Sequence, residues 1–189
     1  MAWPTTQVAT GDLVTAAQLN QLPIALAKAT GAAASYDFQS IPQVWSGLLL
    51  VCSLQSDSTN NQDDLSLRFN NDTGSRYYRQ RIRGSGATAS AAESLAATSM
   101  LIGQITGKSA GAMSSFAMWV PNYTTATVRR SVTSTGGNAF GLATGNLVAE
   151  TYFGFWDNTT DAVSRITIFP AAGLFTSTST AYLYAMGTI

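Results

Sequence analysis

The chain has 189 residues, enough for one domain with a sizeable core, and its formal net charge is zero. Charged residues make up only 11% of the sequence, against about a quarter in typical globular proteins, while hydrophobic residues make up 46%. This balance excludes a disordered chain, and it argues against a general role in binding nucleic acid, which needs an excess of lysine and arginine. Because so little charge opposes association, we expect the protein to pack against copies of itself or against other subunits.

The residues that most often carry catalysis and metal binding are scarce. The sequence has no histidine, and its single cysteine, Cys52, excludes both an intrachain disulfide and a thiolate zinc site. Cys52 lies in an apolar run and is expected to be buried. No apolar run is long enough to span a membrane, and the first residues lack the pattern of a signal peptide. We therefore expect no enzyme, no cofactor and no membrane association.

Residues 1–35 differ from the rest and are predicted to form a short, partly helical N-terminal arm. Thr15 is a suitable N-cap for a helix over residues 16–22, Pro23 interrupts the pattern, and residues 24–28 are expected to add one or two helical turns. An arm this short cannot fold alone, so its apolar side chains are expected to anchor it on a partner surface. The candidate anchoring residues are Trp3, Val8, Leu13, Val14, Leu19 and Leu22.

Residues 36–189 show alternating strand and turn patterns and are predicted to form one β-sandwich domain. The apolar run at 44–54 is typical of a central strand, and the segments at 65–70 and 76–83 alternate with a period of two. Further strands are expected at 100–106, 113–120, 127–133, 148–156, 163–169 and 180–186. A turn is expected at 70–74, a loop or short helix at 84–97, and a loop at 134–146. Short strands at this spacing predict an all-β, antiparallel sandwich of the jelly-roll type.

Three arginines, Arg79, Arg81 and Arg83, fall on one face of the predicted strand at 76–83. Like charges in such a row repel one another unless other groups answer them. Two interpretations remain open: a solvated edge that discourages aggregation, or an interface with carboxylates of a neighbouring subunit. A glycan or a nucleic-acid phosphate is a weaker third. Within a homo-oligomer the candidate carboxylates are Asp57, Asp63, Asp64 and Asp72.

Two minor alternatives involve acidic residues, and a third involves aromatic ones. The same four aspartates could bind calcium, although their spacing matches no EF-hand loop and an ordinary polar loop is the simpler interpretation. Glu150 with Asp157 or Asp161 could supply the two carboxyls of a glycosidase. The aromatic residues at 152–156 are expected to lie mostly in the core, and an exposed subset could stack on sugar rings.

Three short segments resemble a known class of protein. They are TGDLVTAAQLN at 10–20, LRFNNDTGSRYY at 67–78 and STAYLYAM at 179–186, where Ala185 replaces the glycine common in that class. The segments are similar to those of small bacteriophage virion proteins that have an N-terminal anchor and a TNF-like jelly-roll domain.

The resemblance implies a structural protein located in the virion, with the arm on the particle and the sandwich displayed. It implies a homotrimer that contacts other virion proteins, either as a capsid decoration (cement) protein or, alternatively, as a minor tail or tail-fibre protein that binds the host surface. A host-surface glycan is then a further candidate partner. The resemblance transfers no catalytic residue.

Overall fold

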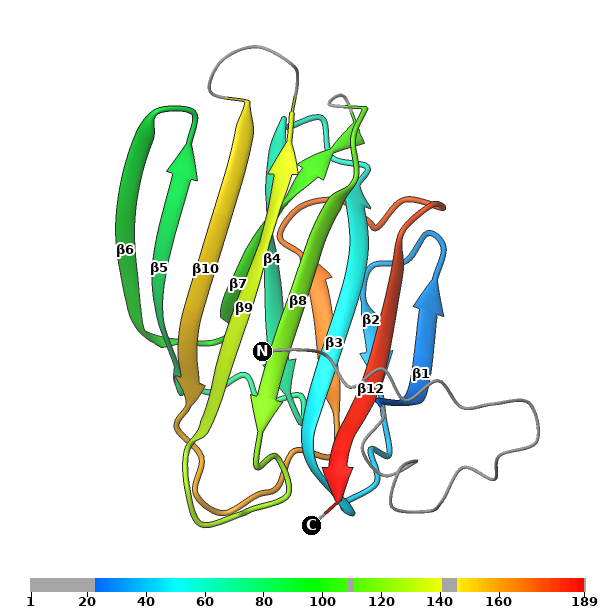
Figure 1. The fold of residues 1–189 in the computed structure, drawn as a ribbon, viewed down its shortest axis with the longest axis vertical. Helices are drawn as coiled ribbons and strands as arrows, with labels where there is room; N and C mark the ends of the chain where they lie inside the picture. Colours follow the sequence, from blue (N-terminus) through cyan, green and yellow to red (C-terminus); the bar gives the residue numbers. More distant parts are fainter. Residues whose placement is uncertain (1–22, 109–110, 141–145, 189) are drawn as a thin grey trace, which may run out of the picture.

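The computed structural model describes residues 23–108, 111–140 and 146–188, and these fold into two facing β-sheets (Figure 1). The described residues contain twelve strands and no α-helix, so the predicted all-β class is confirmed. No helix among them is long and apolar enough to cross a membrane. The helix expected at 16–22 and the six candidate anchoring residues, Trp3, Val8, Leu13, Val14, Leu19 and Leu22, lie outside the described residues.

The larger sheet, which we call sheet A, has eight antiparallel strands in the order β6-β5-β10-β9-β8-β3-β12-β1. Their bounds are β1 (Ile24–Thr30), β3 (Trp45–Ser56), β5 (Tyr77–Ser85), β6 (Thr88–Ala97), β8 (Ser114–Pro121), β9 (Arg130–Ala139), β10 (Leu147–Trp156) and β12 (Thr180–Thr188). Side chains alternate between an inner face, turned toward the second sheet, and an outer face.

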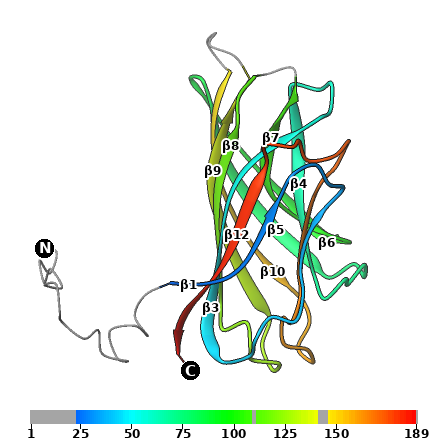
Figure 2. The ribbon, with the colours of Figure 1, turned by 90° about the vertical axis from the view of Figure 1, so that its right-hand side faces the viewer.

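The smaller sheet, which we call sheet B, has the strand order β7-β4-β11-β2. Its strands are β2 (Tyr36–Phe38), β4 (Gln62–Phe69), β7 (Met100–Gly107) and β11 (Ile166–Pro170). Figure 2 shows the two layers edge-on. They are joined where the end of β3 pairs in parallel with β7, Gln55 opposite Thr106 and Ser56 opposite Gly107. The result is an antiparallel sandwich that is compatible with the predicted jelly roll.

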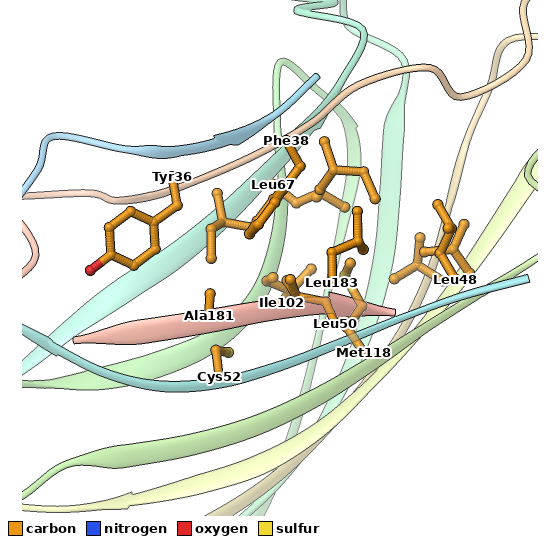
Figure 3. Packing of buried hydrophobic residues seen from close by; sticks show 14 of the residues in the cluster. Tyr36, Phe38, Leu48, Leu50, Cys52, Leu67, Ile102, Met118, Ala181 and Leu183 are labelled. Carbon is orange, nitrogen blue, oxygen red and sulfur yellow. The ribbon is translucent and has the colours of Figure 1, made fainter. Parts of the chain in front are cut away.

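The hydrophobic core lies between the two sheets (Figure 3). Leu48, Leu50 and Leu54 of β3 are at most 1% exposed, and they meet Leu67 of β4 and other side chains of sheet B. Burying one such leucine contributes about 2 kcal/mol to folding. Cys52 is buried in the same row, as predicted, and burial raises the pKa of its thiol to about 12.

Three local predictions were wrong. Residues 24–28 form the strand β1, which pairs with β12, because a free sheet edge overrides weak helical propensity. Residues 84–97 continue the hairpin of β5 and β6, whose Ala- and Ser-rich sequence has no strong period because the edge strand β6 is largely exposed. Strand β9 extends to Ala139, so the first half of the loop expected at 134–146 belongs to sheet A.

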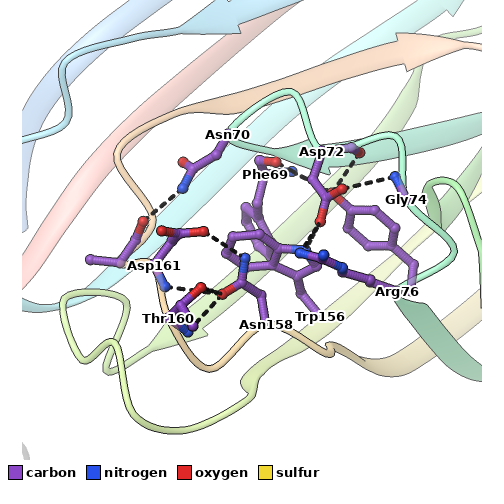
Figure 4. Close-up of polar contacts among 11 residues, drawn as sticks. Phe69, Asn70, Asp72, Gly74, Arg76, Trp156, Asn158, Thr160 and Asp161 are labelled. Atoms are coloured by element: carbon purple, nitrogen blue, oxygen red, sulfur yellow. Dashed lines mark hydrogen bonds and ion pairs between the residues drawn. The ribbon is translucent and has the colours of Figure 1, made fainter.

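Hydrogen bonds connect the predicted turn after β4 to the end of β10 (Figure 4). Asn70 and Asn71 have φ of 51° and 57°, a left-handed conformation that asparagine tolerates. The carboxylate of Asp72 then accepts hydrogen bonds from the Trp156 indole Nε1 at 2.7 Å and from the Gly74 amide at 2.8 Å. Because Trp156 is fully buried, Asp72 satisfies a donor that water cannot reach.

We expect Asp72→Ala to lower the free energy of unfolding by about 2 kcal/mol, because it leaves the buried Trp156 donor unpaired. The measurement is urea denaturation followed by far-UV circular dichroism. Arg76→Ala is the matched control: Arg76 lies 3.6 Å from the same carboxylate, but its side chain is 52% exposed. That variant should change stability by less than about 0.5 kcal/mol. Equal losses in the two variants would contradict the role given to the Trp156 hydrogen bond.

Candidate functional site

The three arginines share one face of β5, and that face is the inner one. Gln80 and Ile82, which alternate with them, are exposed on the outer face, whereas Arg79, Arg81 and Arg83 are partly buried. Sheet B ends near this point, since its last strand β7 lies mainly over β9 and β10. The arginine row therefore lines the open side of the sandwich, where sheet A extends beyond sheet B.

The carboxylate that faces this row comes from the same chain. Glu150 of β10 is 3% exposed and sits in register with Arg83, whose Nε lies 3.5 Å from Glu150 Oε1. Its other oxygen accepts hydrogen bonds of 3.0 Å from the Gln104 backbone amide and from the Tyr152 hydroxyl. Arg81, in register with Tyr152, also attracts the Glu150 carboxylate.

Glu150 and Asn138 together cap the open edge of β7. In the described part of the chain, β3 pairs with this edge only at Thr106 and Gly107. At Gln104 the backbone amide donates to Glu150 and the backbone carbonyl accepts from Asn138 Nδ2 at 2.6 Å. The side chain of Gln62 continues the network, donating to Asn138 Oδ1 at 2.7 Å and accepting from Arg83 Nη2 at 2.9 Å. A polar network thus joins the two sheets where no strand pairing does.

The charges in this network are unequal. Burial raises the pKa of Glu150, against the opposing effects of the Tyr152 hydrogen bond and of attraction to Arg83 and Arg81. Arg83 and Arg81 both attract this one carboxylate, and Arg79 lies further along the same face. Arg79 Nη1 and Arg81 Nε are buried atoms that have no hydrogen-bond partner among the described residues. Donors thus remain for another carboxylate, and the interface role of the row stays a prediction.

The aspartates predicted to pair with the arginines across a subunit interface have other partners within the chain. Asp57 and Asp63 accept from the backbone amides of Leu174 and Ala172, at 2.7 and 3.1 Å, and Asp64 accepts from the Gln104 side chain at 2.8 Å. Asp72 holds Trp156, as described above. In the described ranges, no group of three or more metal-ligating side chains is placed to hold a metal ion.

The candidate glycosidase carboxyls belong to separate networks. Glu150 points between the sheets, whereas Asp157 pairs with Arg129 at 2.6 Å near the surface. Asp161 belongs to a turn in which its carboxylate accepts from Asn158 Nδ2 at 2.8 Å (Figure 4).

The outer face of sheet A is a feature that the sequence reasoning missed. Strand register aligns its side chains in continuous rows across all eight strands. One row is Lys28, Tyr182, Val51, Ala117, Thr135, Thr151, Ile82 and Ala91, and the next is Ala25, Tyr184, Leu49, Trp119, Thr133, Phe153, Gln80 and Glu93. Lys28 and Glu93 are the only charged side chains that the eight strands place on this face. Large apolar side chains are exposed there, including Phe153 at 55% and Ile82 at 65%.

A shallow groove crosses the outer face near β6. Its volume is about 270 Å³, and it is lined by Tyr78, Arg79, Gln80, Glu93, Leu95, Phe153, Gly154 and Phe155, with the guanidinium of Arg79 on the inner side of the sheet. The rings of Tyr78 and Phe155 stack with centroids 4.8 Å apart and an angle of 10° between their planes. The groove therefore combines flat apolar walls with one amide and one carboxylate.

No protein-family model matches the chain, and no curated protein matches it.

We expect Glu150→Ala to lower the free energy of unfolding by about 3 kcal/mol, because it leaves Arg83 and the Gln104 amide without their buried partner. The control is Asp157→Ala, which removes a carboxylate from a surface ion pair with Arg129 and should cost less than about 1 kcal/mol. Urea denaturation of both variants measures the difference. A Glu150→Ala protein as stable as the control would show that the network does not hold the sandwich together.

The raised pKa of Glu150 predicts a specific pH dependence. The unfolded chain releases the Glu150 proton near the ordinary value of 4.5, whereas the folded chain holds it to higher pH. Raising the pH above that value therefore favours the unfolded state. We expect wild type to gain stability relative to Glu150→Gln as the pH falls from neutral toward 4.5, measured as the difference between their denaturation midpoints. A difference that stays constant with pH, or changes in the opposite direction, would refute the assignment.

Proposed function

We propose that this chain is a non-enzymatic structural subunit of a bacteriophage virion, displayed on the particle in the manner of a capsid decoration (cement) protein. The observation that carries the proposal is the outer face of sheet A, where the eight strands place only two charged side chains, one on each edge strand. Apolar and hydroxyl side chains without repelling charge suit contact with protein, and large exposed apolar patches commonly mark such contacts. The three motifs similar to virion proteins support the same assignment.

The proposed assembly is a homotrimer held to other virion proteins by the N-terminal arm. Closed symmetric homo-oligomers are the rule among soluble assemblies, and a net charge of zero leaves little repulsion between copies. No role in binding nucleic acid is proposed.

A minor tail or tail-fibre protein is the second candidate, and the groove near β6 favours it. Exposed Phe153 and the Tyr78–Phe155 pair offer flat rings to a sugar, while Gln80 and Glu93 could bind its hydroxyls. The ligand would then be a glycan of the host surface. Quantitative mass spectrometry of purified particles separates the two roles, because a decoration protein is present in many copies and a tail-tip protein in few.

We expect deletion of residues 1–22 to leave the sandwich folded and to remove the protein from particles. The deletion ends before Ile24 because β1 belongs to sheet A, so a longer truncation would expose the edge of β12. The measurement is the amount of the protein in purified particles, with the melting temperature of the isolated variant as the test of folding. Gln7→Ala in the full-length chain is the control and should be incorporated normally. Wild-type incorporation of the truncated protein would rule out the anchoring role of the arm.

A further inference from the structure

We propose that the outer face of sheet A binds a second copy of this chain, oriented so that the β1 side of one copy meets the β6 side of the other. The inference rests on the proposed function in one respect, namely that the chain assembles with itself. It goes further by naming the surface, the occupant and the relative orientation.

The outer face is large enough for a stable contact. Seven spacings of about 4.8 Å separate its eight strands, and about eight residues per strand span about 26 Å, which gives a face of roughly 900 Å². A standard protein interface covers about 800 Å² on each partner. The face can therefore supply a complete interface without help from loops.

The centre of this face suits burial against protein. Thr135 and Thr151 lie side by side there, with hydroxyl oxygens 3.3 Å apart, between Ala117 on one side and Ile82 on the other. No charge has to leave water when these positions are covered, and depletion of charge is the compositional mark of an interface core. Phe153, in the adjacent row, provides a large exposed ring of the kind enriched at interface centres.

The two edge charges select the orientation. Lys28 lies on β1, with its Nζ 5.3 Å from the centre of the Tyr182 ring, and Glu93 lies on β6 at the opposite edge. Both side chains are exposed, and neither forms an ion pair with another described residue. A head-to-tail ring of three copies around an axis parallel to the strands brings Lys28 of each copy to Glu93 of the next. An axis across the strands would place each charge against its own kind, which is unfavourable.

The test is charge reversal, read out as the dissociation constant of the purified oligomer by sedimentation velocity. We expect Lys28→Glu and Glu93→Lys each to weaken association about tenfold, and the double variant to return it close to wild type. Thr135→Arg should abolish association at micromolar concentration, because it buries an unpaired charge. Ser66→Arg, on the outward side of sheet B, is the matched control and should associate normally. Unchanged far-UV circular dichroism spectra of the variants show that the fold is intact, because the melting temperature itself changes with association.

Several results would overturn the proposal. They are a monomeric wild type, an oligomer that survives Thr135→Arg, and a double variant no better than the single ones. Edge charges can also serve merely to prevent strand addition, but that role requires only a charge, so it predicts no effect of reversal. If wild type is monomeric yet present in particles, the virion function stands and the face is left for a glycan or another virion protein. If wild type associates as described but is absent from particles, only the virion function fails.

Discussion

The buried carboxylate of Glu150 is the interaction on which the open side of the sandwich depends. Sheet A is wider than sheet B, so on this side β7 forms the edge of sheet B, and among the described residues only the end of β3 pairs with that edge. Glu150 accepts a hydrogen bond from the Gln104 amide on that edge and at the same time forms an ion pair with the Arg83 guanidinium on the wider sheet. A single acidic side chain thus provides a partner for an unpaired backbone donor and reduces the repulsion within a row of like charges. Both situations arise because the two sheets differ in width.

This solution gives sheet A an unusual polarity. On β5, β9 and β10 the charged side chains point inward, toward sheet B. Arg130 of β9 is 1% exposed and donates to the Asp161 carbonyl, and Glu150 of β10 pairs with the arginines of β5. The outer surface of the same strands carries Thr, Gln, Gly and aromatic residues instead. A sheet normally buries its apolar side and solvates its charges. Here the charged side chains of Glu150 and its arginine partners connect the two sheets, and the outer face of sheet A carries few charges and can contact other protein surfaces.

The sequence predicted the class of fold well, because alternation over β4 and β5 and the apolar run of β3 are direct consequences of a sheet with one buried face. It also predicted that Arg79, Arg81 and Arg83 share a face. It could not predict that this face is the inner one, because alternation fixes only which residues lie together. Glu150 was considered only as a catalytic carboxyl, since its pairing with Arg83 depends on the register of two strands far apart in the chain. The β1 and β6 strands were missed because edge strands contribute few residues to the core, and so their sequences carry little periodic signal.

The position of β1 connects the two proposed contacts of the molecule. The described chain enters the sandwich at Ile24, at the edge of sheet A that carries Lys28. An arm that precedes this strand therefore departs from the same edge that, in the proposed orientation, faces the β6 side of another copy. Anchoring one copy through its arm would then restrain the edge on which its neighbour docks and reduce the entropy lost when that neighbour binds. On this geometry, attachment to the particle and association between copies favour one another, although each contact uses different residues.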